Sequence, residues 1–251
     1  MPSNYNEVVV GVVLAGGEGR RLRPLSYYFQ KCMIPIGCHQ KPLLEYILFH
    51  LRRHGIFNVK LLVGYKHEQI ENYFNDGSSF GVRIEYFIDD PSFGGSGGAL
   101  LNAVARNAFL DTDVLLVYYG DILSNIDLSE MVRQHVESGS VATLALTNGF
   151  EVPVGVADVK GRDVIGWVEK PRINIYAGIG VVALSTAALG ALKELAVGMK
   201  KLDLMGDLIP FLIGRGEMVQ AYITDAFWYD VGSLEKYEKI DNDTIDKLFN
   251  P

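Results

Sequence analysis

The sequence predicts an α/β protein in which helices cover both faces of a mostly parallel β-sheet. Continuous runs of apolar, largely β-branched residues, at 8–14 and 114–118, are typical of strands buried on both faces. Segments with apolar residues at helical spacing follow such runs, so that strands and helices alternate. The 251 residues, 49% of them hydrophobic, can bury one large core, and we expect a single domain over 1–251.

In the first half of the chain, the helices have recognisable starts and stops. Pro42 opens a helix whose apolar residues recur up to Leu51, and Gly55 ends it. Asp127 is a suitable N-cap for a helix at 128–137, because its side chain can accept from free backbone N–H groups. We expect strands at 8–14, 59–63, 82–87 and 114–118, and helices at 42–54, 68–74, 99–109 and 128–137.

The second half has short strands joined by tight turns, and Lys160-Gly161 is a hairpin signal. Because the chain contains no linker or low-complexity segment, we divide the one domain into a first half at about 7–135 and a second at about 140–235. No hexapeptide repeat is present, so we expect no C-terminal β-helix domain. The expected elements are strands at 141–146, 155–159, 164–169, 176–183, 218–223 and 228–231, and helices at 186–195, 207–213 and from 233.

Composition excludes several classes of protein. The formal net charge is −7, whereas a general nucleic-acid binder carries a basic surface. No run of about 18 apolar residues is present to span a membrane, and the apolar run at 8–15 is short for a signal peptide. The two cysteines, Cys32 and Cys38, form no C-x-x-C motif. We therefore expect a cytoplasmic protein with reduced thiols, acting on small molecules without nucleic-acid or membrane partners.

The strongest functional signal directly follows the first predicted strand, in the segment 14–25. Its glycines allow backbone N–H groups to approach an anion, and three arginines follow within a few residues. Leu22 stands where a dinucleotide-binding motif has its third glycine, and the Gly-Lys-Ser/Thr end of a Walker A loop is missing. The segment predicts a polyphosphate site of another kind, with a solvated basic turn as the alternative.

This segment resembles the signature of the sugar-1-phosphate nucleotidyltransferases, also called nucleoside-diphosphate-sugar pyrophosphorylases. Further segments that resemble this family follow in order at 30–35, 41–46, 64–65, 95–100, 120–121, 154–156, 169–171, 177–179 and 228–233. The resemblance implies a three-layer, Rossmann-like fold with a mixed sheet, of the nucleotide-diphospho-sugar transferase type. It also implies transfer of a nucleotidyl group from a nucleoside triphosphate to a sugar 1-phosphate, with release of pyrophosphate. The first half would bind the nucleotide and the second half the sugar phosphate.

The resemblance assigns the triphosphate to Arg21 and Lys31 as catalytic residues. A guanidinium suits the spreading charge of a departing pyrophosphate, and an ammonium provides a point charge near the attacked phosphate. The remaining residues implied to bind the nucleotide are Leu14, Ala15, Gly16, Gly17, Gly19, Asp90, Gly95 and Ser96.

The resemblance implies a Mg²⁺ site at Asp121 and Asp230, since this ion takes one or two carboxylates together with phosphate oxygens. As the alternative, Asp121 and Asp230 could each be an ordinary turn residue that holds no metal. Glu169 and Lys170 resemble the family's sugar-binding pair, although a lysine before proline is also common in exposed turns. Two further residues, Gly155 and Gly178, match positions where the backbone approaches the sugar, with a β-bulge as the alternative reason for glycine.

Three residues depart from the family pattern. Gln30 replaces a proline, so the loop loses a φ restraint and we expect Lys31 to be more mobile. Tyr176 stands where many relatives have asparagine, which leaves the sugar contact there open. Arg20 replaces a common threonine and adds charge beside Arg21. None of the three removes a group that the chemistry requires.

The predicted preference for one nucleotide base rests on the loop at 89–94, where relatives place a side chain that contacts the base. The carboxylate of Asp90 can only accept hydrogen bonds, whereas the amide of thymidylyl and uridylyl members can also donate. Guanine offers two adjacent donors, but a thymine carbonyl facing a carboxylate costs roughly 1–3 kcal/mol. The sequence favours GTP and, by family association, mannose 1-phosphate. The alternatives are glucose 1-phosphate with dTTP or UTP, or a loop in which Asp89 and Asp90 simply face water.

Two other classes of function compete. The segment 94–98 matches the G-x-S-x-G motif of serine hydrolases, but the last histidine is His135, too early for that fold's base. A non-catalytic protein that binds nucleotide or sugar phosphate is the second rival, and the intact basic and acidic residues argue against it. We expect an enzyme that is a monomer or small homo-oligomer.

Overall fold

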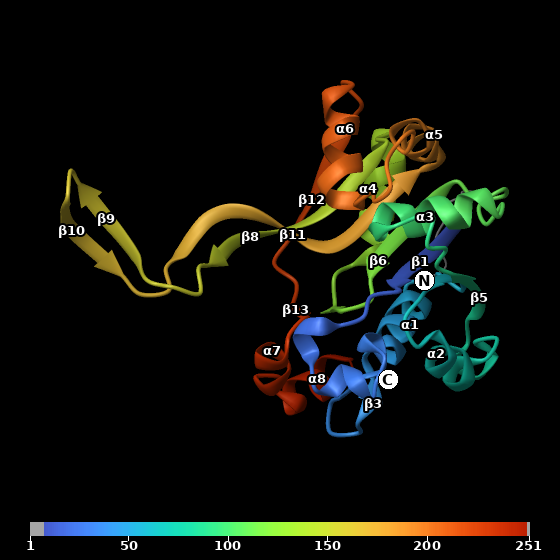
Figure 1. Ribbon diagram of the computed structural model, residues 1–251, viewed down its shortest axis with the longest axis horizontal. Coiled ribbons are helices and arrows are strands. Elements are labelled where there is room, and N and C mark those ends of the chain that lie inside the picture. Colours follow the sequence, from blue (N-terminus) through green and yellow to red (C-terminus); the bar gives the residue numbers. More distant parts are fainter. Residues whose placement is uncertain (1–7, 250–251) are drawn as a thin grey trace.

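The computed structural model describes residues 8–249, apart from the side chain of Phe150, and centres on a seven-stranded sheet (Figure 1). The strand order is β12-β8-β11-β6-β1-β4-β5, and all strands except β11 run in the same direction. The strands are β1 (Val9–Ala15), β4 (Asn58–Val63), β5 (Arg83–Ile88), β6 (Val114–Tyr119), β8 (Ala142–Glu151), β11 (Arg172–Ser185) and β12 (Val219–Thr224).

Apolar side chains on both faces of the sheet produce the three layers. In β1, Val12 and Val13 are both fully buried, but they point to opposite faces and belong to two separate cores. One face is covered by α1 (Leu43–Arg53), α2 (His67–Phe74), α4 (Leu128–Ser138) and α8 (Asn242–Phe249). The other is covered by α3 (Gly95–Ala105), α5 (Thr186–Leu195) and α6 (Ile209–Gly214). The predicted α/β class is therefore confirmed.

Several boundaries differ from the sequence prediction. Helix α3 begins at Gly95, four residues before the expected start, and ends at Ala105. Its glycines are poor helix formers, but a Cβ at Gly97 would lie 2.0 Å from Leu202 Cδ2, and one at Gly98 would lie 2.6 Å from the Phe93 backbone. The close packing of these glycines against Leu202 and Phe93 therefore explains why α3 begins in a glycine-rich segment. The expected helix at 207–213 is a π-helical turn (Leu204–Leu208) followed by α6. The predicted cap is present, since Asp127 accepts from the Glu130 N–H at 2.9 Å.

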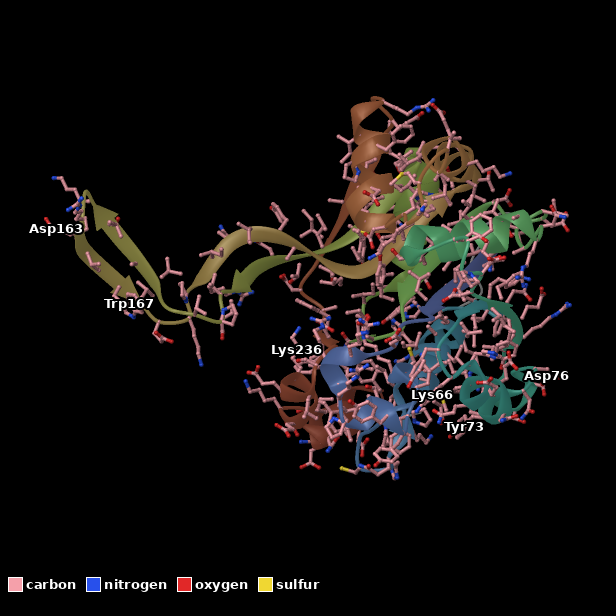
Figure 2. All side chains as sticks on the ribbon, viewed as in Figure 1. Lys66, Tyr73, Asp76, Asp163, Trp167 and Lys236 are labelled. Atoms are coloured by element: carbon pink, nitrogen blue, oxygen red, sulfur yellow. The ribbon has the colours of Figure 1, made fainter. Side chains whose placement is uncertain are left out.

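An extended arm, residues 148–176, leaves the body as a two-stranded ribbon formed by the ends of β8 and β11 (Figure 1). It terminates in the hairpin of β9 (Val156–Lys160) and β10 (Asp163–Val168). Because β8 runs parallel to β1 and β6, the arm departs from the edge where the carboxyl ends of these strands lie. Most hairpin side chains are exposed, and they stand free of the body (Figure 2).

Short elements complete the same edge of the sheet. Strand β7 (Ile122–Ser124) pairs with β13 (Trp228–Asp230), and α7 (Leu234–Glu238) follows β13. The strands β2 (Pro35–Ile36) and β3 (Lys41–Pro42) form a small hairpin before α1. Among the helices of residues 8–249, none combines the length and apolar character needed to cross a bilayer.

Candidate active site

A cavity of about 550 Å³ opens at the carboxyl ends of β1, β4, β5 and β6. This is the edge at which open α/β sheets bind ligands. Backbone and small side chains form one side of it. The residues lining the cavity include the predicted nucleotide-binding residues Leu14, Ala15, Gly16, Gly17, Gly95 and Ser96, and also Lys31 and Asp121.

Lys31 and Asp121 meet in the wall of this cavity. The Lys31 ammonium donates to the Asp121 carboxylate, and both side chains are largely buried. Lys31 begins the short 3₁₀ helix η3 (Lys31–Met33) after the glycine-rich loop, and Asp121 lies between β6 and β7. The lysine predicted to bind the triphosphate and the aspartate predicted to bind the metal therefore form an ion pair with each other in this protein.

Gln30 fixes the loop that carries Lys31. Its side chain is completely buried, its Nε2 donates to the Ala15 carbonyl at 2.6 Å, and its Oε1 accepts from the Cys32 N–H at 2.5 Å. Its backbone N–H donates to Gln69 Oε1 at 2.6 Å. These three bonds oppose the mobility that the sequence predicted for Lys31. The amide at position 30 thus supplies a restraint that proline would supply through φ.

Asp230 is brought beside Asp121 by strand pairing. Residue 230 of β13 lies opposite Ile122 of β7, and the Val231 N–H donates to the Asp121 carbonyl at 2.8 Å. The Asp230 Oδ2 accepts from Lys236 Nζ at 2.5 Å, whereas its Oδ1 is buried without a hydrogen-bond partner. Two carboxylates with one unsatisfied oxygen fit a hard cation that keeps its other positions for phosphate and water. The described residues hold no group of three or more His, Cys, Asp or Glu placed around one metal position.

Arg21 lies at the rim and does not line the cavity. A Cβ at Gly232 would lie 3.2 Å from Arg21 Nη2 and 2.4 Å from Asp230 Oδ1, so the guanidinium is next to the second aspartate. Gly19 precedes it with a φ of 62°, a left-handed conformation that favours glycine. Arg20 is exposed, and its Nε donates at 2.6 Å to Glu18, a residue that lines the cavity.

Two neighbouring aspartates differ in their relation to the cavity. Asp89 lines the cavity, but Asp90, which the sequence prediction selected, does not. The Asp90 carboxylate accepts from the Ser92 N–H at 2.8 Å, and this bond lowers the pKa of Asp90. The physical reason is the alternation of side chains at the end of β5, which sends consecutive residues in opposite directions.

The hydroxyl of Ser96 holds α3 against the chain near residue 203 by hydrogen bonds. Its Oγ donates to Asp203 Oδ2 at 2.9 Å and accepts from the Leu204 N–H at 2.8 Å. Tyr119 donates to the same hydroxyl at 3.4 Å. The serine of the G-x-S-x-G match is therefore bonded to an acid and a tyrosine, and no histidine is among its hydrogen-bond partners in the described chain.

The predicted sugar-side residues lie outside the cavity. Gly155, Glu169 and Lys170 are on the arm, and Gly178 is in β11 where the arm meets the body. A Cβ at Gly155 would lie 2.1 Å from Trp167 Cζ2 and 2.8 Å from Glu169 Oε2. Only glycine thus allows the indole and the carboxylate to close over position 155.

Lys170 connects the arm electrostatically to the body. The pKa of Glu235 in α7 is lowered, chiefly by the hydrogen bond and charge of Lys239 and also by the charges of Lys170 and Lys236. The Lys170 ammonium therefore acts on the helix that follows Asp230. In Figure 2, Lys236 lies on the side of the body toward the arm, and Trp167 lies far out on the arm.

Several cavity and rim residues were missed by sequence reasoning. Asp89 belongs to the same loop sequence as Asp90, so the sequence could have indicated either residue. Lys236 comes shortly after the matched segment 228–233, and its position near that segment was the only sequence signal for it. No pattern indicated Lys201, which reaches the cavity from the segment before the π-helical turn. The missed residues are Gln30 in its positioning role, Asp89, Tyr119, Lys201 and Lys236.

Comparison with known proteins matches the chain to one family. The family model described as "Nucleotidyl transferase" matches residues 10–247. Over 245 residues the chain is 32% identical to the UTP–glucose-1-phosphate uridylyltransferase of Synechocystis sp., covering 90% of this chain and 61% of that protein. Over 236 residues it is 30% identical to the D-glycero-alpha-D-manno-heptose 1-phosphate guanylyltransferase of Aneurinibacillus thermoaerophilus, covering 91% of this chain and 95% of that protein.

A solved structure shares the predicted architecture. It belongs to a Bacillus anthracis protein, provisionally assigned as a glucose-1-phosphate thymidylyltransferase and crystallised with sucrose. Its TM-score is 0.76 at 23% identity, and the match covers 97% of this chain and 99% of that one. This likeness confirms the three-layer fold with a mixed sheet. The chain spans only about three fifths of the length of several curated relatives, such as the 61% of the Synechocystis enzyme.

Proposed function

This chain belongs to the nucleotidyl transferase family, and we propose that it transfers a nucleotidyl group from a nucleoside triphosphate to a sugar 1-phosphate. In this reaction an oxygen of the sugar phosphate forms a bond to the α-phosphorus, and the bond to the departing pyrophosphate breaks. The observation that carries the proposal is the pairing of Lys31 with Asp121 inside a cavity walled by the glycine-rich loop. Positioning and charge supply the catalysis in such a transfer.

The protein's own cations bind the triphosphate. Lys31 lies inside the cavity, where its ammonium can pass from Asp121 to the phosphates. Arg21, at the rim beside Asp230, can take the charge that develops on the departing pyrophosphate. The backbone N–H groups of Gly16 and Gly17 line the same cavity and can donate to phosphate or ribose oxygens.

We propose Mg²⁺ as the metal, held by Asp121 and Asp230. Asp121 directly precedes β7, Asp230 ends the paired strand β13, and the buried Asp230 Oδ1 lacks a partner, which fits an oxygen-seeking cation. When bound, this ion would supply neutralisation of phosphate charge. The aspartates themselves fix its place relative to Lys31.

We assign the sugar phosphate to the part of the arm that carries Gly155, Glu169 and Lys170. Lys170 contributes to lowering the pKa of Glu235 in α7, and we propose that its ammonium holds the phosphate of the sugar. Glu169 lies beside Gly155, and its carboxylate offers an acceptor to sugar hydroxyls. Gly178 forms the junction through which the arm joins the sheet.

Mannose 1-phosphate with GTP is our preferred substrate pair. A carboxylate rather than an amide at the end of β5 favours guanine, and a guanylyltransferase is among the relatives at 30% identity. Glucose 1-phosphate with UTP or dTTP is the second candidate, supported by the uridylyltransferase at 32% identity. We further propose a cytoplasmic monomer or small homo-oligomer that has no nucleic-acid or membrane partner.

The test is pyrophosphate release, measured for GTP, ATP, CTP, UTP and dTTP against several sugar 1-phosphates. Asp121→Asn is the inactive control. A matched pair that turns over supports the enzyme, and the preferred pair identifies base and sugar. Nucleotide binding without turnover for every pair would favour the rival function, a non-catalytic binder. Labelling by a fluorophosphonate at Ser96 would instead support a hydrolase.

A further inference from the structure

The hairpin at the end of the arm has an apolar side and a side that carries charges. In the pairing of β9 with β10, Val159 lies opposite Val164, so both side chains point to the same side. Trp167 pairs two residues before Val159 and therefore points to that side as well. The pair Lys160–Asp163 belongs to the opposite side. Strands that alternate in this way normally pack their apolar side against other apolar groups.

Within the described chain, this apolar side of the hairpin is left open to solvent. Val159, Val164 and Trp167 are 55%, 63% and 64% exposed. The labelled Trp167 and Asp163 lie well away from the body (Figure 2). A two-stranded hairpin by itself is only marginally stable in water, because it has no third strand or helix to cover it. The arm therefore needs a partner that the single chain does not provide.

The arm exposes enough apolar surface for a stable interface. Of the large apolar side chains that are exposed in residues 8–249, ten lie in the arm, residues 148–176. Together they expose on the order of 800 Å² in each arm. A standard stable interface buries about 800 Å² on each partner. Apolar patches of this size on a protein surface mark interaction sites.

The distribution of charge favours a second copy of this chain as the partner. The arm carries four acidic and four basic residues, so its formal net charge is zero, whereas the whole chain has a net charge of −7. Two copies that meet through their bodies repel each other, but two arms meet without net repulsion. In a twofold dimer each copy uses the same patch, which a neutral and apolar surface allows.

We propose that two copies of this chain pair arm to arm across a twofold axis. The apolar sides of the two hairpins, each defined by Val159, Val164 and Trp167, pack against each other in this dimer. The free surface of the hairpin thereby becomes the centre of an interface between copies.

The pairing also holds the sugar side of the site, a consequence that rests on the proposed function. A Cβ at Gly155 would lie 2.1 Å from Trp167 Cζ2 and 2.8 Å from Glu169 Oε2, so the indole closes over Gly155 beside this carboxylate. A partner arm that covers Trp167 fixes the ring, and the ring fixes the residues assigned to the sugar phosphate. Trp167 is thus a positioning residue, and the site is incomplete in a single copy.

Sedimentation velocity tests the dimer without requiring turnover. We would compare wild type, Val164→Glu and Val168→Glu from about 0.1 µM to about 100 µM, and wild type should be a dimer with a Kd of about 1 µM or lower. Val164→Glu should raise this Kd at least about 100-fold, because each copy would bury an unpaired carboxylate. Val168 pairs with Val156 on the opposite side of the same hairpin, so Val168→Glu is the matched control and should change the Kd by less than about threefold.

Three outcomes would overturn the arm-to-arm dimer. The first is a wild type that is monomeric over the whole range, which needs no variant and does not depend on how Val164→Glu folds. If such a monomer sediments with vesicles of anionic lipid, the apolar side faces a membrane instead. The second is a dimer that Val164→Glu leaves intact, and the third is an equal weakening by both variants. The last two would place the interface elsewhere or remove its dependence on the apolar side.

Kinetics test the consequence for the sugar separately. In Val164→Glu the KM for sugar 1-phosphate should rise roughly tenfold, with the Kd for the nucleotide changed by less than about threefold. An unchanged KM in a monomeric Val164→Glu would overturn the positioning by the partner arm. A dimer that Val164→Glu dissociates, with no pyrophosphate release by either protein, would contradict the proposed reaction and leave the arm-to-arm pairing in place.

Discussion

Lys31 donates a hydrogen bond to Asp121, and this ion pair joins the glycine-rich loop after β1 to the end of β6. A second pair of the same kind lies beside it, because Lys236 donates to Asp230. Each carboxylate proposed to hold Mg²⁺ is thus already paired with an ammonium. When bound as proposed, Mg²⁺ would be held by the two carboxylates, and Lys31 and Lys236 would be free to pair with the phosphates.

Removal of either aspartate should abolish most of the activity. Asp121→Asn and Asp230→Asn each replace a charged metal ligand by a neutral one, and we expect kcat to fall roughly 10²-fold to 10⁴-fold. Pyrophosphate release at saturating Mg²⁺ measures this. Asp163→Asn, at the tip of the arm, is the control and should retain wild-type kcat. A rate near that of wild type in either site variant would contradict the two-carboxylate metal site.

Lys236→Met should strengthen metal binding by the free protein. The substitution keeps much of the aliphatic stem but removes the ammonium that competes for Asp230. We expect the Kd for Mn²⁺, used as a spectroscopic substitute for Mg²⁺, to fall by about threefold or more. Electron paramagnetic resonance of free Mn²⁺ gives this constant. Lys239→Met changes a surface pair with Glu235 and should leave it unchanged. Equal or weaker binding by Lys236→Met would show that Asp230 does not hold the metal.

Gly155→Ala should selectively impair use of the sugar phosphate. The added Cβ meets the Trp167 ring at 2.1 Å and must separate it from Glu169. We expect KM for sugar 1-phosphate to rise roughly tenfold, with KM for the nucleotide within about twofold of wild type. Gly166→Ala lies in the same hairpin, where the nearest atom to its Cβ is at 3.3 Å, and is the matched control. A parallel rise of both KM values would contradict the division of the cleft into a nucleotide half and a sugar half.

Gln30→Leu should destabilise the fold, because it leaves the Ala15 carbonyl and the Cys32 N–H without their side-chain partner in a fully buried place. We expect the free energy of unfolding to decrease by about 2 kcal/mol, as measured by urea denaturation. Gln134→Leu removes a more exposed amide that bonds the Ala221 carbonyl and should cost less than half as much. Equal losses in the two variants would show that the restraint on the Lys31 loop is not supplied by Gln30.

The sequence predicted the sheet and the position of its ligand site, because strand-forming runs and the residues after them are local properties. The resemblance assigned Lys31 to the triphosphate and Asp121 to the metal, and the structure joins the two side chains. Which of Asp89 and Asp90 lines the cavity was beyond sequence reasoning, since a shift of one residue at a strand end reverses the direction of a side chain. The arm shows a second limit. The short strands and the turn at Lys160-Gly161 predicted β9 and β10, but such local signals do not tell whether a hairpin packs on the body or stands away from it (Figure 1).

His135 makes stability depend on pH. Its ring is buried between α4 and β8, its Nδ1 lies 2.9 Å from Thr143 Oγ1 and 3.1 Å from Ser140 Oγ, and burial lowers its pKa to about 4. An unfolded histidine titrates at about 6.5, so between these values the unfolded chain binds more protons than the folded one. The stabilising contribution is therefore complete above about pH 6.5 and is lost as the pH falls toward 4, by at most about 1.4 kcal/mol per pH unit.

Urea unfolding of wild type and His135→Gln at several values between pH 7.5 and 4.5 measures this contribution. Glutamine can still bond to the Thr143 hydroxyl but does not titrate, so the variant should lose less stability on acidification than wild type. The exposed His39, replaced in the same way, is the control and should leave the slope unchanged. Identical slopes for wild type and His135→Gln would mean that His135 is protonated in the folded protein at mildly acidic pH. The buried, neutral ring bonded between Thr143 and Ser140 would then be the wrong description of this part of the core.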